Sequence, residues 1–271
     1  MKEISITIES MRDAVIKGRK NGCDELVLSG GEPTLYPEYI IDLISLANGL
    51  GYKKYIIQTN GYGIATSDRL VSFLDGIAGN SEICISFSVH GHVAALHDRI
   101  SDTVGAFEYL MEAVEKISKT RCLIYTNTVI NAYNINCLNN IASMLLPYNT
   151  RIMQFSMMHL KEKSPLYVSF ADSVQAIRQL REIVSLDVLR TEGVPYCCLH
   201  GMEQCVGESA WPTVLDLYNK DNDYMSDFKQ LEYGMRRKMD NCDKCILNDI
   251  CMGVWTEHFD EFSSLGFHPI I

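Results

Sequence analysis

The fold prediction starts from residues 26–38, which read LVLSGGEPTLYPE. Its apolar run stops at Gly30 and Gly31, which are followed by Glu32 and Pro33. Glycine has no Cβ, so a ligand can approach the backbone closely at such a turn. The proline restricts the residue before it to an extended backbone. The pattern predicts a buried strand that ends either in a ligand-binding turn or in a tight turn with a solvated glutamate.

Length and composition describe an ordinary folded protein. The 271 residues are 47% hydrophobic and 21% charged, enough for one α/β domain of barrel size, with or without an appendage. The net charge of −10 argues against a nucleic-acid or anionic-membrane surface. No apolar run has membrane length, and residues 1–22 are too charged for a secretory signal. We therefore expect a cytoplasmic protein without nucleic-acid or membrane partners.

Apolar strand-like segments alternate with amphipathic helical segments along the chain. The strands begin near residues 26, 55, 83, 122 and 152, and the helices cover about 8–20, 39–51, 66–78, 103–119 and 135–148. This alternation predicts parallel βαβ units and an α/β fold, either an open sheet or a barrel. Ligands then bind at the carboxyl ends of the strands. Those ends carry the glycines and polar residues, in SGGEP, QTNGYG, SVHGH, TNTVIN and QFSMMH.

The first predicted element is a helix, although a helix of this type normally crosses over from a preceding strand. The strand near residue 26 is therefore expected at an unpaired sheet edge, which proteins usually cover or blunt. We expect either that something outside this chain covers that edge or that the domain is incomplete.

Four motifs together resemble the radical S-adenosylmethionine (SAM) superfamily. LSGGEPTLYPE, IIQTNGY, ISFSVHG…HDRISDTVGAFE and NTVIN…N follow one another in the order and spacing of that family, over roughly residues 10 to 160. The resemblance implies a partial (β/α)6 TIM-like barrel, here lacking its first strand. It also implies that the two glycines and the glutamate of GGEP hold the amino group of SAM.

The resemblance carries further cofactor-binding positions. The TNG turn would line the cofactor and substrate rim, and the serine after ISF would contact the ribose or the methionine carboxylate. Later matches are looser: Asn127, Asn131, and Met157 near the adenine. The cofactor-binding residues implied in this way are Gly30, Gly31, Glu32, Thr59, Asn60, Ser88, Asn131 and Met157.

The family's catalytic [4Fe–4S] cluster has no matching ligands here. In that family a CxxxCxxC loop after the first strand binds three irons, and the fourth iron chelates SAM. No CxxxCxxC occurs in this sequence, and the position before the first helix holds only MKEISIT. We expect either a truncated chain whose missing segment also carries the missing strand, or a degenerate homologue. Affinity for SAM is expected to fall in both cases.

Six of the ten cysteines crowd the last third of the chain. A cytoplasmic chain keeps its thiols reduced, so disulfides are not expected. Cys242 and Cys245 form a CxxC knuckle, Cys251 follows, and the fourth thiolate comes from Cys197 or Cys198, with Cys205 as a spare. Zinc and [4Fe–4S] both accept four thiolates, and spacing alone does not separate them from each other.

Many radical SAM enzymes carry C-terminal auxiliary clusters in similar surroundings. The resemblance therefore favours an auxiliary [4Fe–4S] cluster over zinc or free thiols, with the ligands Cys197, Cys242, Cys245 and Cys251. In contrast, His90, His92 and His97 lack the spacing of one helical face, and we predict no metal site there.

We therefore predict a radical-SAM-like partial barrel at 1–160, a helical connection at 161–196 and an auxiliary iron–sulfur tail at 197–271. The intact form would cleave SAM reductively and abstract hydrogen from a substrate such as a peptide. The alternatives are a non-catalytic binding or accessory module on the same scaffold, and a zinc-stapled barrel enzyme. The sequence assigns no catalytic side chain and determines neither the substrate nor the oligomeric state.

Overall fold

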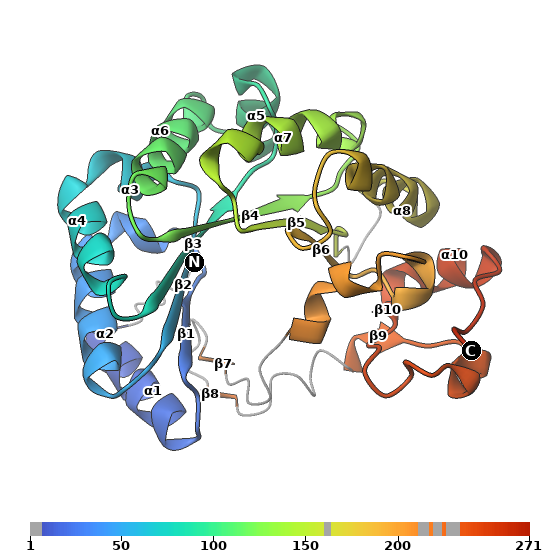
Figure 1. Cartoon of the computed structure of the whole chain (residues 1–271), viewed down its shortest axis with the longest axis horizontal. Helices are drawn as coiled ribbons and strands as arrows, with labels where there is room; N and C mark the ends of the chain where they lie inside the picture. Colours follow the sequence, from blue (N-terminus) through green and yellow to red (C-terminus); the bar gives the residue numbers. More distant parts are fainter. Residues whose placement is uncertain (1–6, 160–163, 211–216, 219–223, 226–233) are drawn as a thin grey trace. The chain divides into compact units, whose positions relative to one another are not determined.

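A single parallel sheet forms the centre of the fold. The computed structural model describes residues 7–159, 164–210, 217–218, 224–225 and 234–271. Six strands of these residues form one sheet in the order β1-β2-β3-β4-β5-β6, which is also their order along the chain (Figure 1). Among the described strands, β1 (Glu25–Leu28) lies at one edge of this sheet. The sequence analysis predicted this edge position for the strand near residue 26.

Contacts within the chain define two compact units. Unit 1 comprises Met1–Ser88, Glu108–Ile124 and Pro212–Leu231, and unit 2 comprises Val89–Phe107, Tyr125–Trp211 and Glu232–Ile271. Helix α6 and strand β4 each begin two residues before their unit boundary. These units do not coincide with the segments 1–160, 161–196 and 197–271, which stay a prediction.

Unit 1 contains the first half of the sheet with its helices. Its main elements, where η denotes a 3₁₀ helix, are α1 (Ile8–Lys20), β1, η1 (Pro33–Leu35), α2 (Pro37–Gly49), β2 (Lys54–Thr59), α3 (Tyr62–Thr66), α4 (Asp68–Ile77), β3 (Glu82–Ser88), α6 (Ala106–Ser118), and the hairpin β7 (Leu217–Tyr218) and β8 (Tyr224–Met225).

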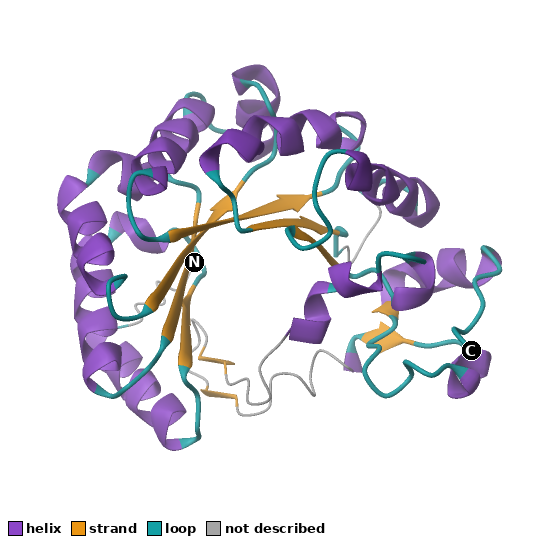
Figure 2. Cartoon of the chain, viewed as in Figure 1, coloured by secondary structure: helices purple, strands orange, loops and turns teal. Residues whose placement is uncertain are grey.

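Figures 1 and 2 show α1, α2 and α4 along one side of these strands. Buried apolar side chains of the strands form part of the core of unit 1. Tyr55, Ile57, Ile83, Ile85 and Phe87 alternate along β2 and β3 and are at most 1% exposed. The residues between them are mostly partly exposed. The strands end in polar side chains, Gln58 and Thr59 in β2 and Ser88 in β3.

Local sequence signals fix where the helices begin. Thr7, Ser67 and Ser169 precede α1, α4 and α8, and each side chain accepts a hydrogen bond from the backbone N–H three residues further on. These caps satisfy donors that a helix cannot satisfy internally. The predicted starts of the first two of these helices are thus correct to within two residues.

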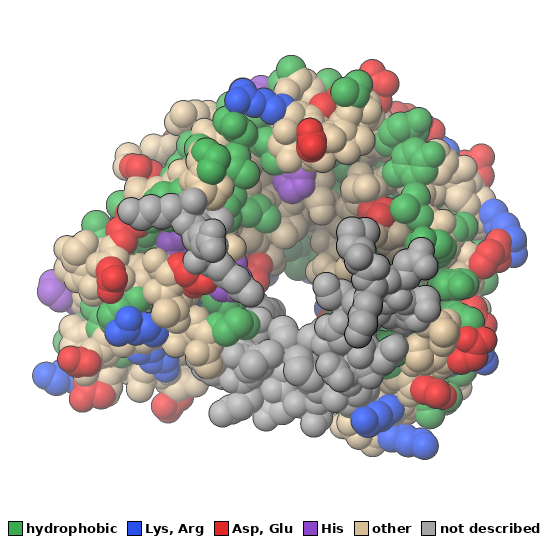
Figure 3. Space-filling model, turned by 180° about the vertical axis from the view of Figure 1, so that it is seen from behind, with side chains coloured by type: hydrophobic (Ala, Val, Ile, Leu, Met, Phe, Trp, Pro, Cys, Tyr) green, Lys and Arg blue, Asp and Glu red, His purple; other side chains and the backbone are tan. Residues whose placement is uncertain are grey.

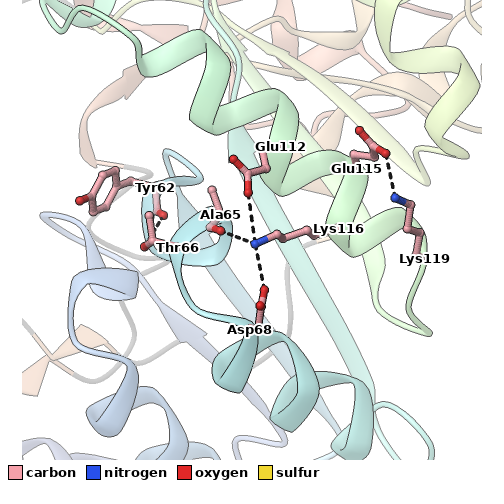
Figure 4. Close-up of polar contacts among 8 residues, drawn as sticks. All are labelled: Tyr62, Ala65, Thr66, Asp68, Glu112, Glu115, Lys116 and Lys119. Carbon is pink, nitrogen blue, oxygen red and sulfur yellow. Dashed lines mark hydrogen bonds and ion pairs between the residues drawn. The ribbon is translucent and has the colours of Figure 1, made fainter.

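Lys116 of α6 ties α3 to α4 inside unit 1. Its ammonium group donates to the carbonyl of Ala65 and to Asp68 at 2.9 Å, and it pairs with Glu112 at 3.2 Å (Figure 4). Hydrogen bonding to Asp68 is the main cause that raises the pKa of Lys116, so the side chain stays charged. Because Ala65 lies in the last turn of α3, this contact also satisfies a carbonyl at that helix end.

Unit 2 holds the second half of the sheet and the cysteine-rich tail. Its elements are α5 (Ala94–Ser101), β4 (Leu123–Val129), η2 (Ile135–Cys137), α7 (Leu138–Leu145), η3 (Leu146–Tyr148), β5 (Ile152–Ser156), α8 (Phe170–Gln179), η4 (Leu180–Glu182), β6 (Leu189–Glu192), η5 (Tyr196–Cys198), η6 (Glu203–Cys205), η7 (Gly207–Ala210), β9 (Arg236–Arg237), η8 (Asp240–Lys244), β10 (Val254–Trp255), η9 (Thr256–His258) and α10 (Phe259–Ser264).

Strand β6 differs from the sequence prediction. The segment 161–196, expected as a helical connection, contains α8 and η4 but also this four-residue strand, which pairs in parallel with β5. Leu189 and Thr191 are buried, whereas Arg190 and Glu192 are partly exposed. With a single apolar side chain in LRTE, the strand carried no apolar run that sequence periodicity could detect.

The tail has a small core of its own. β9 and β10 pair antiparallel, and Arg236 forms an ion pair with Glu208 at 2.8 Å, with side chains 1% and 4% exposed. The guanidinium carbon of Arg236 also lies 3.7 Å from the centre of the Trp255 ring. Phe262 of α10 meets Phe170 of α8 at a centroid distance of 5.6 Å. The tail is thus packed onto the helices of unit 2.

Two surface properties bear on function. Among the described residues, no helix is both long enough and apolar enough to cross a bilayer. Acidic and basic side chains are interspersed on the described surface seen in Figure 3.

Substitution of Gly63 in α3 tests the close packing of α3 against η1. A Cβ at Gly63 would lie 2.0 Å from the carbonyl oxygen of Thr34, whereas a Cβ at Gly76 of α4 would meet nothing within 4 Å. We expect Gly63→Ala to lower the free energy of unfolding by about 1–3 kcal/mol or more. Gly76→Ala should leave it unchanged or raise it by up to about 1 kcal/mol. Urea unfolding measures both, and equal effects would contradict the described packing.

Candidate functional site

The carboxylate of Glu32 joins the end of β1 to the end of β2. Its Oε1 accepts hydrogen bonds from the backbone N–H of Thr34 at 3.0 Å and from the hydroxyls of Thr34 and Thr59. Its Oε2 accepts the backbone N–H of Asn60 at 2.7 Å. The structure thus brings Glu32, Thr59 and Asn60 together, and the alternative of a freely solvated glutamate does not hold.

Thr34 is a member of this network that the sequence did not single out. It is 1% exposed, and its hydroxyl accepts the backbone N–H of Gly63 at 3.2 Å. Thr59 in turn accepts the backbone N–H of Gly61 at 3.0 Å. The sequence signal for this role was the position of Thr34 directly after Pro33 of GGEP. A threonine at such a turn commonly forms hydrogen bonds with the backbone.

Gly30 and Gly31 leave open space beside the carboxylate. Their φ angles are +88° and +59°, a backbone region that strongly favours glycine. A Cβ built on either residue would meet no atom within 4 Å. The glycines are therefore required by backbone conformation rather than by packing, and their peptide groups stay accessible to a ligand.

The site fits a ligand that carries an ammonium group. A carboxylate can accept about four hydrogen bonds, two at each oxygen. Oε1 of Glu32 accepts three from the described residues, whereas Oε2 accepts one, from Asn60. Among the described residues, Oε2 therefore has room for one further N–H donor.

The other predicted cofactor residues have different surroundings. Ser88 ends β3 in unit 1 and is partly exposed. Asn131 is 2% exposed, and its side-chain amide forms hydrogen bonds with neighbouring residues. It donates to the carbonyl of Val129 at 3.1 Å and accepts from the backbone N–H of Tyr133 at 3.0 Å. Met157 is 5% exposed and follows β5. Their roles as ligands stay predictions.

Unit 2 contains a polar cluster of which the sequence analysis singled out Asn127 alone. The Ser156 hydroxyl lies 2.8 Å from Oδ1 of Asn127 and 2.9 Å from Oε2 of Glu192, and the Gln154 amide donates to Glu192 at 3.0 Å. These residues come from the ends of β4, β5 and β6. The sequence analysis did not predict strand β6, so it could not place Glu192 at the end of a strand.

The histidines of SVHGHVAALHD serve the local structure. His97 is 2% exposed, its Nδ1 accepts the backbone N–H of His90 at 3.1 Å, and the two rings stack at 5.5 Å. Burial is the main cause that lowers the pKa of His97 to about 4. Burial also lowers the pKa of His90.

All four predicted metal ligands line one cavity in unit 2. Cys197, Cys242, Cys245 and Cys251 contribute to its lining together with Pro195, Tyr196 and Phe262. Cys198 is fully buried and is not part of this lining, and Cys205 instead points its thiol at the carbonyl of Leu186, 3.7 Å away. Of the candidates for the fourth ligand, Cys197 is the one that faces the cavity.

The protonation of these thiols depends on burial and on neighbours. Burial raises the pKa of Cys242 and of Cys251. Hydrogen bonding from Cys198 lowers the pKa of Cys197. Among the described His, Cys, Asp and Glu residues, no group of three or more is arranged around a single metal ion.

The motifs at the strand ends coincide with a known family. The model of the Radical SAM superfamily matches residues 1–145, more than half of the chain. The chain belongs to the radical SAM superfamily.

Solved radical SAM structures share the fold. The structure of native anSMEcpe with bound AdoMet and Kp18Cys peptide has a TM-score of 0.63 at 16% identity, over 91% of this chain and 80% of that one. SuiB of Streptococcus suis has a TM-score of 0.62 at 13% identity, over 91% of this chain and 59% of that one. In another match, to native anSMEcpe with bound AdoMet, the chain covers 50% of the other chain.

These matches confirm the predicted fold class. The six parallel strands with their helices correspond to the α/β sheet of the partial-barrel type found in radical SAM proteins. The Glu32 network and the open glycines fit the amino group of SAM. Because the sequence contains no CxxxCxxC, we assign none of its residues to the catalytic cluster of the family.

His97 predicts a pH dependence of stability. Its pKa falls from an unfolded value near 6.5 to about 4 in the fold, so the unfolded chain binds the proton first as the pH drops. The stability that the neutral ring contributes is complete above pH 6.5 and declines toward pH 4, by at most roughly 3 kcal/mol at ~1.4 kcal/mol per pH unit.

Urea unfolding between pH 7 and pH 4 tests this expectation. His97→Asn keeps an acceptor for the His90 backbone N–H and removes the titrating ring, so its stability should depend less on pH than that of the unmodified protein. Parallel curves for the two proteins would show that His97 does not titrate as described.

Proposed function

We propose that this chain binds SAM at the Glu32 turn and, together with a catalytic [4Fe–4S] cluster to which we assign none of its own residues, takes part in the radical modification of a peptide. The observation that carries the proposal is the Glu32 carboxylate, which Thr34, Thr59 and Asn60 hold by hydrogen bonds directly after two glycines with open space around them. Superfamily membership supports SAM as the ligand.

The residues of the site have separable roles in this proposal. Glu32 accepts a hydrogen bond from the ammonium group of SAM and so orients its methionine end. Gly30 and Gly31 let that end approach the backbone, since neither has a side chain to exclude it. Ser88, Asn131 and Met157 contact other parts of the cofactor. When bound and reduced, SAM supplies proteins of this family with a 5′-deoxyadenosyl radical that abstracts hydrogen.

A peptide substrate is the second part of the proposal. Its support is the fold shared with anSMEcpe bound to AdoMet and Kp18Cys peptide, and with SuiB bound to its precursor peptide SuiA, at TM-scores of 0.63 and 0.57. Both likenesses lie at or below 16% identity, so they concern the fold, and the substrate of this chain is inferred.

We further propose an auxiliary [4Fe–4S] cluster held by Cys197, Cys242, Cys245 and Cys251. Its support is the cavity that these four cysteines line. Superfamily membership favours a cluster over zinc, because many radical SAM enzymes carry auxiliary clusters in similar surroundings. Four thiolates would ligate every iron, so such a cluster would transfer electrons or stabilise the tail.

SAM binding tests the role of Glu32. We expect Glu32→Gln to weaken SAM binding by about tenfold, because a neutral amide loses a charge-assisted hydrogen bond of about 1.5–3 kcal/mol. Equilibrium dialysis of the full chain measures this loss. Glu38→Gln is the control, since Glu38 is an exposed glutamate whose side chain pairs with Arg69.

Methylthioadenosine distinguishes a direct role of Glu32 from a structural one. It lacks the amino-acid end of SAM, so Glu32→Gln should leave its affinity unchanged. An equal loss for both ligands would mean that Glu32 only maintains the turn. Unchanged SAM binding in Glu32→Gln would contradict the proposed site.

Anaerobic reconstitution tests the auxiliary cluster. We expect about four irons per chain with a charge-transfer absorption band. Cys242→Ser, Cys251→Ser and Cys197→Ser should each lose most of this iron, whereas Cys205→Ser, at a thiol outside the cavity, should keep it. Binding of one zinc and no iron would refute the cluster. Loss of iron in Cys198→Ser but not in Cys197→Ser would reassign the fourth ligand.

A further inference from the structure

The cavity lined by the four cysteines has a distinctive charge pattern. Two basic residues, Arg237 and Lys238, contribute to its wall, and none of the described residues that line it is acidic. Much of the remaining wall is apolar, formed by Pro195, Met239, Phe262 and Pro269. An anionic group bound there would leave water for apolar surroundings, which is costly unless a cation compensates.

Lys238 is tied to the loop that carries two of the cysteines. Its ammonium nitrogen donates to the backbone carbonyl of Asn248 at 2.6 Å and to the side-chain oxygen of the same residue at 3.1 Å. Asn248 lies between Cys245 and Cys251 and itself donates its backbone N–H to the carbonyl of Cys245 at 3.0 Å. The side chain therefore holds the middle of this loop by two hydrogen bonds at once.

The neighbouring basic residue is directed elsewhere. The guanidinium carbon of Arg237 lies 3.6 Å from the centre of the Phe259 ring, so its charge is engaged by an aromatic face. Lys244 is an exposed lysine of the CxxC knuckle and does not belong to the cavity lining. Of these three basic residues, Lys238 combines a place in the cavity wall with hydrogen bonds to the cysteine loop.

We propose that Lys238 is a positioning residue of the auxiliary site that closes the loop between Cys245 and Cys251 and favours the reduced state of the bound cluster. This inference rests on the proposed auxiliary cluster. Four thiolates around a doubly positive [4Fe–4S] core form a dianion, and one-electron reduction adds a further negative charge. A fixed ammonium group stabilises the more negative state more strongly, so it raises the reduction potential.

The experiment compares full-length chains reconstituted anaerobically and titrated with dithionite as the electron donor. Electron paramagnetic resonance gives the midpoint potential, and iron analysis gives the loading. We expect Lys238→Met to lower the reduced-to-oxidised ratio at a given potential by about threefold to tenfold, or about 30–60 mV at 59 mV per tenfold for one electron. Its iron loading should also fall.

Two further variants separate charge from structure. Lys238→Arg keeps the charge and should restore both the potential and most of the iron. Lys238 and Lys244 are both exposed, but Lys244 lies outside the cavity lining, so Lys244→Met should change neither property. If Lys238→Met retains the potential and the iron of the unmodified chain, the inference is overturned while the auxiliary cluster stands.

Failure of the proposed function has a different signature. An unmodified chain that binds no iron would refute the auxiliary cluster itself. If Lys238→Met loads too little iron for titration, Lys238→Arg decides the question. If Lys238→Arg has the same reduction potential as the unmodified chain, the result supports the role of the charge. If Lys238→Arg loses as much iron as Lys238→Met, the inference is overturned.

Discussion

The hydrogen bonds of Glu32 are the constraint on which the rim of unit 1 depends. The turns after β1 and β2 expose backbone N–H groups that cannot join the sheet ladder, and buried donors need acceptors. The Glu32 carboxylate and the hydroxyls of Thr34 and Thr59 supply them. One carboxylate thus fixes two turns at once, and the geometry that would receive a ligand exists before any ligand binds.

Much of the fold could be predicted from the sequence because its strands and helices alternate with clear periods. The carboxyl ends of neighbouring parallel strands lie side by side, so Glu32, Thr59 and Asn60 could be placed together before the contacts were known. Asn131 shows the limit of this reasoning. Its position after a strand was predictable, but the use of its amide by the local turn depends on backbone angles that the sequence pattern does not specify.

The cysteine tail shows the same limit at the level of one residue. Spacing identified Cys242, Cys245 and Cys251, but it could not choose between the adjacent Cys197 and Cys198. The choice depends on the orientation of the η5 turn, which Arg178 holds by donating to the carbonyl of Cys198 at 2.8 Å. That contact comes from a helix that the sequence prediction had not delimited, so no local pattern could report it.

The two sites differ in what holds them together without a ligand. The Glu32 turn is closed by hydrogen bonds among its own groups, so it is organised whether or not SAM is present. In the cysteine cavity burial raises the pKa of Cys242 and Cys251, so it favours the protonated thiols. The proposed metal centre would displace protons from these thiols, so its binding would be linked to pH and to the packing of the tail. The hydrogen bonds of the Glu32 turn come from residues 32–60 alone, whereas the cysteine cavity would gain further bonds from the proposed metal centre.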